Sequence, residues 1–271
     1  MNRRSLLLAA GAVGVTTAVG GAAAAIAADD PEAGRGARPM FTWELAGGFV
    51  PAGWSALRAP RLVAYDDGVL RQLRDEQRAR LRVPGIADAA KRLRIGPGEL
   101  RSLRNHATTV LRDPANARRR AGAPIIADVP STVFTARTNG RRFSLQFEGL
   151  EETRRDRADP TPAYSLLDHC TQLRDRVNRT GTAFAPDAVR MIAVLLDAAQ
   201  PASAPVPPWP AGVPVPRFRK DEFLVQTDLR DRRARALMRA VPRPDSAQWP
   251  VFRLPDGRRA QLNWRFLLPH E

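Results

Sequence analysis

Alternation of apolar and polar residues predicts several short strands early in the chain. An apolar residue at every second position is typical of a β-strand that buries one face. This pattern occurs at 41–45. Apolar stretches follow at 61–65 and 69–73, and Asp66, Asp67 and Gly68 separate them. An Asp-Gly turn between apolar runs favours a hairpin whose two central residues take positive φ. We therefore expect the last two stretches to pair.

A second hairpin is predicted around Asn139 and Gly140. A two-residue turn at these positions places Thr138 opposite Arg141. The same turn pairs apolar side chains on one face, namely Ala136 with Phe143, Phe134 with Leu145, and Thr132 with Phe147. Turn chemistry and alternation therefore predict the same register independently.

Helical spacing of apolar residues predicts a helix at 97–112. Pro97 suits its first turn, and Asp113 and Pro114 end it. Its apolar side consists of Leu100, Leu103, Ala107, Val110 and Leu111.

A second helix is predicted from Thr161 to about residue 179. Thr161 is the expected N-cap, Pro162 the first helical residue, and Gly181 follows the end. Its apolar stripe consists of Leu166, Cys170, Leu173 and Val177.

The remaining elements are shorter. The apolar run 189–196 is predicted as a buried strand, although its length alone does not exclude a helix. A strand at 222–226 precedes a helix to 241 that Thr227 or Asp228 caps. A final hairpin turns at 255–257. Its last strand is expected to be half-buried, with one face formed by Ala260, Leu262, Trp264, Phe266 and Leu268 and the other by Arg259, Gln261, Asn263 and Arg265.

These elements predict an α+β fold, with a mostly antiparallel sheet built from hairpins and about three helices packed on one face. We divide the chain into a signal peptide (1–27), a flexible spacer (28–39), a main α+β region (40–200), a proline-rich crossing (201–216) and a C-terminal strand-helix-hairpin (217–271). Seven prolines make the crossing stiff and extended. We expect the last region to pack on the same sheet.

The first residues have the pattern of a twin-arginine export signal. Arg3 and Arg4 stand before Leu6 and Leu7, an uncharged Ala- and Gly-rich stretch follows, and Ala25 and Ala27 form a cleavage site. This pattern predicts recognition by the twin-arginine export machinery, cleavage by signal peptidase after Ala27, and an extracellular or cell-envelope location. The alternative is an uncleaved anchor, because the uncharged run 5–28 is long enough to span a bilayer.

The chain is strongly basic, with 43 Lys and Arg against 28 Asp and Glu and a net charge of +15. The basic residues are spread along the whole chain, and only Lys91 and Lys220 are lysines. No run of stacking aromatic residues accompanies them, so we do not expect nucleic-acid binding. Attraction to anionic wall polymers or lipid head groups fits this charge better.

Few residues of the sequence are suited to catalysis or to metal and cofactor binding. One Cys and three His leave little material for a metal site, and no cofactor-binding motif occurs. Asp168, His169 and Cys170 are adjacent, but consecutive helical residues point in different directions, so we expect a buried structural Cys170. No serine-hydrolase elbow is present. His106 and His270 remain possible bases, although a surface or terminal position is the simpler interpretation.

The predicted hairpin register creates one candidate binding site. Arg137 faces Arg142 across the hairpin, and facing like charges are destabilising unless they point into water or share an anion. Together with the neighbouring Arg141 they form a candidate anion site. The alternative is a pair of solvated arginines that share the surface with Glu148 or another carboxylate.

Several stretches resemble a group of uncharacterised exported proteins and lipoproteins from actinobacteria. The similar pieces are 47–51 (Gly-Gly-Phe-Val-Pro), 65–69 (Tyr-Asp-Asp-Gly-Val), 128–132 (Asp-Val-Pro-Ser-Thr), Trp249, 256–257 (Asp-Gly) and 265–271 (Arg-Phe-Leu-Leu-Pro-His-Glu). The resemblance implies an extracytoplasmic location and no known reaction or cofactor. The chain lacks the anchoring Cys of the lipoproteins, and Phe266 stands where Pro is common.

The sequence thus favours a non-enzymatic envelope protein that binds an anionic component. The alternative is a secreted hydrolase whose site forms only in three dimensions. A deep pocket with a perturbed carboxylate, or a His beside a Ser, would favour the hydrolase, and a flat polar sheet face would favour binding. A third possibility is an interaction module whose proline-rich segment docks on a partner.

Overall fold

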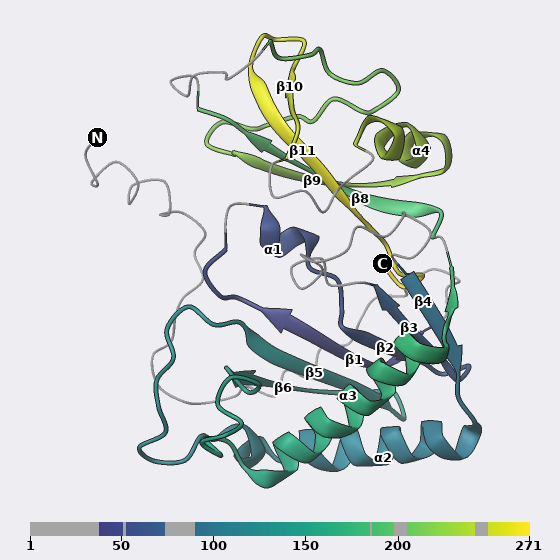
Figure 1. Cartoon of the computed structure of the whole chain (residues 1–271), viewed down its shortest axis with the longest axis vertical. Helices are drawn as coiled ribbons and strands as arrows, with labels where there is room; N and C mark the ends of the chain where they lie inside the picture. Colours follow the sequence, from purple (N-terminus) through teal and green to yellow (C-terminus); the bar gives the residue numbers. More distant parts are fainter. Residues whose placement is uncertain (1–37, 51–52, 74–89, 185, 198–204, 242–248) are drawn as a thin grey trace.

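Seven strands form one antiparallel sheet in the order β6-β5-β1-β2-β3-β4-β7 (Figure 1). The computed structural model describes residues 38–50, 53–73, 90–184, 186–197, 205–241 and 249–271. The strands of this sheet are β1 (Pro39–Ala46), β2 (Leu62–Tyr65), β3 (Val69–Leu73), β4 (Ala90–Arg94), β5 (Ser131–Thr138), β6 (Arg141–Glu148) and β7 (Thr182–Ala183).

A second antiparallel sheet has the order β10-β11-β8-β9. Its strands are β8 (Ala188–Leu195), β9 (Leu224–Arg230), β10 (Val251–Arg253) and β11 (Arg259–Phe266). The α+β class is confirmed, but the strands form two sheets where we expected one. The division between the sheets falls between β7 and β8, before the proline-rich segment. Residues 189–196 do form a buried strand, because β8 packs against neighbours on both faces.

Two helices cover one face of the seven-stranded sheet (Figure 1). They are α2 (Pro97–Arg112) and α3 (Thr161–Thr180), and a short 3₁₀ helix, η5 (Pro114–Ala117), follows α2. The apolar stripes predicted for both helices are buried against strand residues such as Phe41, Phe134 and Phe147. The other two helices, α1 (Trp54–Leu57) and α4 (Asp231–Ala240), pack on the four-stranded sheet.

The hairpin β5–β6 has the predicted register throughout, including Thr138 opposite Arg141. Asn139 and Gly140 both have positive φ, as the predicted turn requires. The β2–β3 hairpin also forms, but only Gly68 of its turn has positive φ. The amide of Gly68 donates to the carbonyl of Tyr65, so the loop is a three-residue turn ending in a left-handed glycine.

Two predicted helix starts are wrong. The structure places Pro160 at the N-cap of α3, one residue before Thr161. Thr227 and Asp228 do not cap a helix, because β9 continues through both to Arg230 and pairs with β8. Asp231 begins α4 with φ 52°; an aspartate tolerates this left-handed conformation better than most residues.

The last strand, β11, is buried on both faces. Leu262, Trp264 and Phe266 face the core of the four-stranded sheet, as predicted. The other face was expected to be exposed, yet Asn263 and Arg265 are also buried. The reason is α1, which packs on β8 and accepts a hydrogen bond at the Ala56 carbonyl from Arg265 Nε (3.2 Å).

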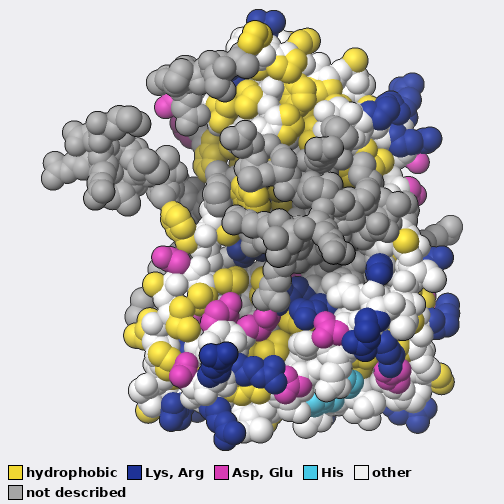
Figure 2. All heavy atoms as spheres, in the orientation of Figure 1, with side chains coloured by type: hydrophobic (Ala, Val, Ile, Leu, Met, Phe, Trp, Pro, Cys, Tyr) yellow, Lys and Arg dark blue, Asp and Glu magenta, His cyan; other side chains and the backbone are white. Residues whose placement is uncertain are grey.

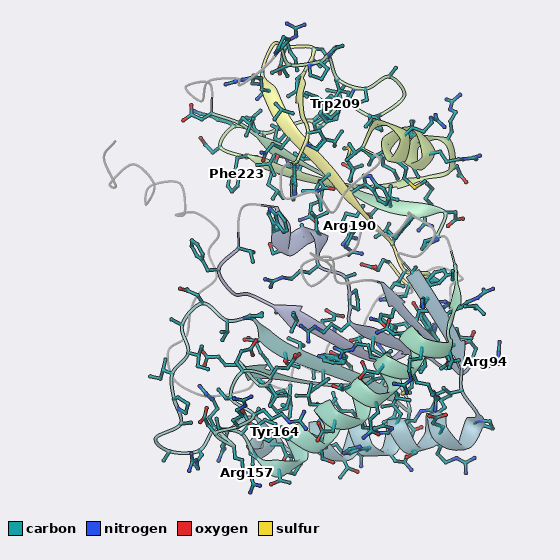
Figure 3. The ribbon with its side chains drawn as sticks, viewed as in Figure 1. Arg94, Arg157, Tyr164, Arg190, Trp209 and Phe223 are labelled. Atoms are coloured by element: carbon teal, nitrogen blue, oxygen red, sulfur yellow. The ribbon has the colours of Figure 1, made fainter. Side chains whose placement is uncertain are left out.

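The proline-rich segment borders the four-stranded sheet in its described part. The Trp209 amide donates to the Arg253 carbonyl, and the Arg253 amide donates to the Pro207 carbonyl, both at 2.8 Å. Trp209 also packs against Phe252 and the core, on the side of the molecule shown in Figure 3. Residues 205–216 are therefore held to this sheet as an irregular border.

The two sheets meet at the face of the seven-stranded sheet that lies away from α2 and α3, which we call the far face. Val63 and Tyr65 of β2 point to this face and belong to the core of the four-stranded sheet. The chain after β11 returns along the same region, where Tyr65 contacts His270. This docking covers β2 and leaves β1, β5 and β6 to form the floor of the site described next.

Candidate functional site

The candidate site is a small pocket on the far face. Phe41, Trp43 and Phe134 point toward the helices, so strand alternation directs Thr42, Glu44 and Thr135 to the far face. The pocket has a volume of about 120 Å³. Its lining consists of Pro39, Met40, Phe41, Thr42, Glu44, Thr135, Arg137, Arg142 and His270.

Two of the three predicted anion-binding arginines line this pocket. Arg137 is directly opposite Arg142 in the register, and both contribute to the lining. Arg142 Nε is buried and has no hydrogen-bond partner among the described residues. Arg141 lies at the turn, is exposed, and alternates to the opposite face, so it does not join them. Glu148, suggested as their neighbour, lies 3.8 Å from Arg119 instead.

His270 forms one wall of the pocket. Its Nδ1 lies 2.9 Å from the hydroxyl of Tyr65. Burial raises the pKa of Tyr65, which keeps its hydroxyl protonated. Burial lowers the pKa of His270, and the positive charges of Arg265, Arg137 and Arg71 add to this, whereas Glu271 opposes it. In the tautomer in which Tyr65 donates to Nδ1, Nε2 of the neutral imidazole carries the proton and is a hydrogen-bond donor.

Glu44 contributes a carboxyl group to the same pocket. Burial raises its pKa, and Glu271 adds to the shift, whereas a hydrogen bond from Thr42 and the charges of Arg142 and Arg265 oppose it. Among the described residues Glu44 forms no ion pair. The pocket therefore contains the cationic side chains of Arg137 and Arg142 together with one carboxyl group, that of Glu44, whose pKa is shifted by its neighbours.

Ion pairs hold the segment that carries His270. Arg265 binds Glu271 with two hydrogen bonds, of 2.9 and 2.5 Å. Glu271 also accepts a hydrogen bond from the Leu268 amide (3.0 Å). Arg190 on β8, labelled in Figure 3, binds Asp228 on β9 and lies 3.7 Å from Glu271. These contacts fix His270 relative to both sheets.

A second polar cluster lies in an open groove between α2 and α3, near Tyr164 in Figure 3. Ser165 Oγ is 3.3 Å from His106 Nε2, and His106 Nδ1 is 3.2 Å from His169 Nδ1. The ring centroids are 5.4 Å apart at an interplanar angle of 21°, so the two rings are stacked. Burial lowers the pKa of both histidines, and His106 adds to the shift of His169. One neutral ring therefore donates to the other.

The sequence motif around Cys170 separates in the structure. Cys170 is fully buried in the helical stripe, and burial raises the pKa of its thiol. Asp168 forms an ion pair with Arg154, and His169 turns to His106. These three neighbours do not form a catalytic group.

Sequence reasoning missed Glu44 and the pairing of His106 with His169. Alternation on β1 could have placed Glu44 on the face opposite Phe41 and Trp43. The histidine pair depends on how α2 packs against α3, and neither helix pattern specifies that crossing. His270 was considered as a base, but its place beside the arginines depends on the docking of the two sheets.

Other predictions concern charge and export. Figure 2 shows Lys and Arg interleaved with Asp and Glu over the lower part of the viewed face.

The signal residues Arg3, Arg4, Leu6, Leu7, Ala25 and Ala27 lie outside the described residues. None of the helices described is long and apolar enough to cross a membrane. Within the same described ranges, no three His, Cys, Asp or Glu side chains are placed to hold a metal ion.

Comparisons of the chain with protein-family models, with curated proteins and with solved structures find no match. The resemblance to actinobacterial exported proteins stays a prediction.

Proposed function

We propose that this protein is an exported cell-envelope protein that binds an acidic group in the far-face pocket. The observation that carries the proposal is the pairing of Arg137 with Arg142 at the pocket, beside His270. A phosphate or carboxylate bound in the pocket interacts favourably with two guanidinium groups at once. The protonated nitrogen of His270 adds a neutral donor.

The size of the pocket supports a small acidic group as the ligand. A cavity of roughly 150 Å³ accommodates a benzene molecule, and this pocket measures about 120 Å³. The pocket therefore has room for one tetrahedral or planar anion and for few further atoms. A longer envelope polymer would insert a single acidic group and leave the rest of its chain outside.

The test compares two double variants of equal charge. In Arg137→Gln/Arg142→Gln, we expect affinity for inorganic phosphate, measured by isothermal titration calorimetry, to fall at least tenfold. The control is Arg232→Gln/Arg233→Gln, which removes two exposed arginines of α4 and should leave binding unchanged. Equal losses in both variants, or salt-insensitive retention of the first variant on anionic envelope material, would contradict the proposal.

A second candidate function is hydrolysis in the groove between α2 and α3. It is favoured by the chain of contacts from Ser165 to His106 to His169, which resembles a nucleophile, a base and an orienting group. It ranks second because Ser165 lies inside a helix, where backbone amides are already bonded and offer no oxyanion donors. Labelling by a fluorophosphonate probe, lost in Ser165→Ala and His106→Gln, would establish it; an unlabelled wild type would exclude it.

A further inference from the structure

We propose that Glu44 makes the far-face pocket selective for an oxyanion that carries a proton, and that the ligand is hydrogen phosphate or the singly protonated form of a phosphate monoester. The inference rests on the proposed anion site and specifies the chemistry of its ligand. Sulfate has the same shape and charge as hydrogen phosphate but holds no proton at neutral pH. The pocket is therefore expected to distinguish the two ions.

The arginines alone cannot make this distinction. Arg137 and Arg142 are donors without acceptor capacity, and they would bind sulfate as readily as phosphate. In the tautomer in which Tyr65 donates to Nδ1, His270 also presents only an N–H to the pocket. Selectivity for a proton on the ligand requires an acceptor in the lining.

Glu44 supplies that acceptor. An ionised carboxylate accepts hydrogen bonds but cannot donate them. The P–OH group of hydrogen phosphate can donate to it, whereas a sulfate oxygen meets it as a like charge without a proton. A site built to accept a hydrogen bond disfavours a ligand that lacks the donor. The carboxylate thus lowers sulfate affinity more than phosphate affinity.

The environment of Glu44 predicts how selectivity depends on pH. Burial raises its pKa, so the carboxyl takes up a proton at a higher pH than an exposed glutamate does. It then donates to any oxyanion, and sulfate affinity should rise. The charged and titratable groups around it are Glu271, Arg142 and Arg265, with Arg137 and His270 also lining the pocket. Protonation of His270 strengthens binding of both ions.

The experiment measures binding of inorganic phosphate and sodium sulfate by calorimetry at pH 7.5. We expect the wild type to bind phosphate at least tenfold more tightly than sulfate at this pH. We also expect its affinity for sulfate, which does not titrate in this range, to rise more between pH 7.5 and 5 than the sulfate affinity of Glu44→Gln. In Glu44→Gln, whose amide can donate to either ion, the two affinities should agree within about threefold. The control Glu148→Gln removes the same charge from an exposed position on β6 and should keep the wild-type ratio.

The outcomes separate this inference from the proposed function. If the wild type binds neither ion, the anion site itself is wrong. If it binds both equally, the anion site stands and the role of Glu44 is overturned. The wild-type ratio at pH 7.5 remains decisive even if Glu44→Gln does not fold. A third titration with glycerol 3-phosphate at pH 6, near the second pKa of a monoester, shows whether the ligand is an ester end group or the free ion.

Discussion

At the scale of single residues, Arg265 and Glu271 have the largest structural role near the pocket. Both side chains are nearly inaccessible, at 9 % and 12 % exposure. Burial alone would raise the pKa of Glu271, but the hydrogen bonds and charge of Arg265 hold it below its ordinary 4.5. A carboxyl group with a depressed pKa stabilises the folded state above its unfolded pKa, and this contribution is lost as the pH falls through the folded value.

We therefore predict that Glu271→Gln lowers the free energy of unfolding by about 3 kcal/mol at pH 7, because it leaves a buried guanidinium without its charge partner. Urea denaturation measures the loss. The comparison is Asp256→Asn, which breaks an exposed pair with Arg258 and should cost far less than Glu271→Gln. Similar losses in the two variants would show that burial does not distinguish these pairs.

The residues of the site were predictable only in part. The facing of Arg137 and Arg142 follows from one local turn, so sequence alone predicts it. The contribution of His270 depends on a contact with Tyr65, 205 residues away in the chain. No local pattern encodes such a contact.

At the scale of elements, turn residues and capping residues predict hairpins and helix ends well wherever strand pairing does not hold the same residues in an extended conformation. The β5–β6 register and the bounds of α2 follow from turn, proline and apolar spacing. The start of α4 does not. Thr227 and Asp228 are good capping residues, but strand pairing with β8 and the Arg190–Asp228 ion pair hold them extended.

The β5–β6 turn gives a prediction at this scale. Gly140 has φ 74° and open space around its Cα, so Gly140→Ala is strained by its backbone conformation alone. We expect a loss of about 1–2 kcal/mol in the free energy of unfolding. Gly98→Ala provides the contrast, because Gly98 lies in α2 with open space and no positive φ, and it should gain up to about 1 kcal/mol. Thermal unfolding of both variants checks the opposite signs.

At the scale of the whole molecule, the division into two sheets could not be predicted. The apolar run of β8 indicates burial but does not specify its partners, β9 and β11, which follow the proline-rich segment. The same division brings His270 of the final segment onto the far face of the first sheet. The pocket is thus a product of how the sheets dock.

Docking of the sheets should make stability depend on pH. The pKa of His270 is lowered in the folded state, so the unfolded chain binds a proton more readily, and stability falls as the pH drops below the ordinary value of 6.5. The slope for one proton is at most about 1.4 kcal/mol per pH unit. His270→Gln should flatten the dependence between pH 6.5 and 5, measured by urea denaturation. Glu44, whose pKa is raised, acts in the opposite direction, so Glu44→Gln should steepen it.

The order of pairing along the chain has a consequence for folding kinetics. The β5–β6 hairpin joins near neighbours, such as Thr138 and Arg141, whereas β11 reaches back to pair Phe266 with Val189. Loop closure makes the distant pairing the slower event. Arg137 and Arg142 can therefore take their places early, while His270 arrives only once the long-range contacts have formed. A ligand would then bind only the fully folded protein, and its binding would stabilise that state further.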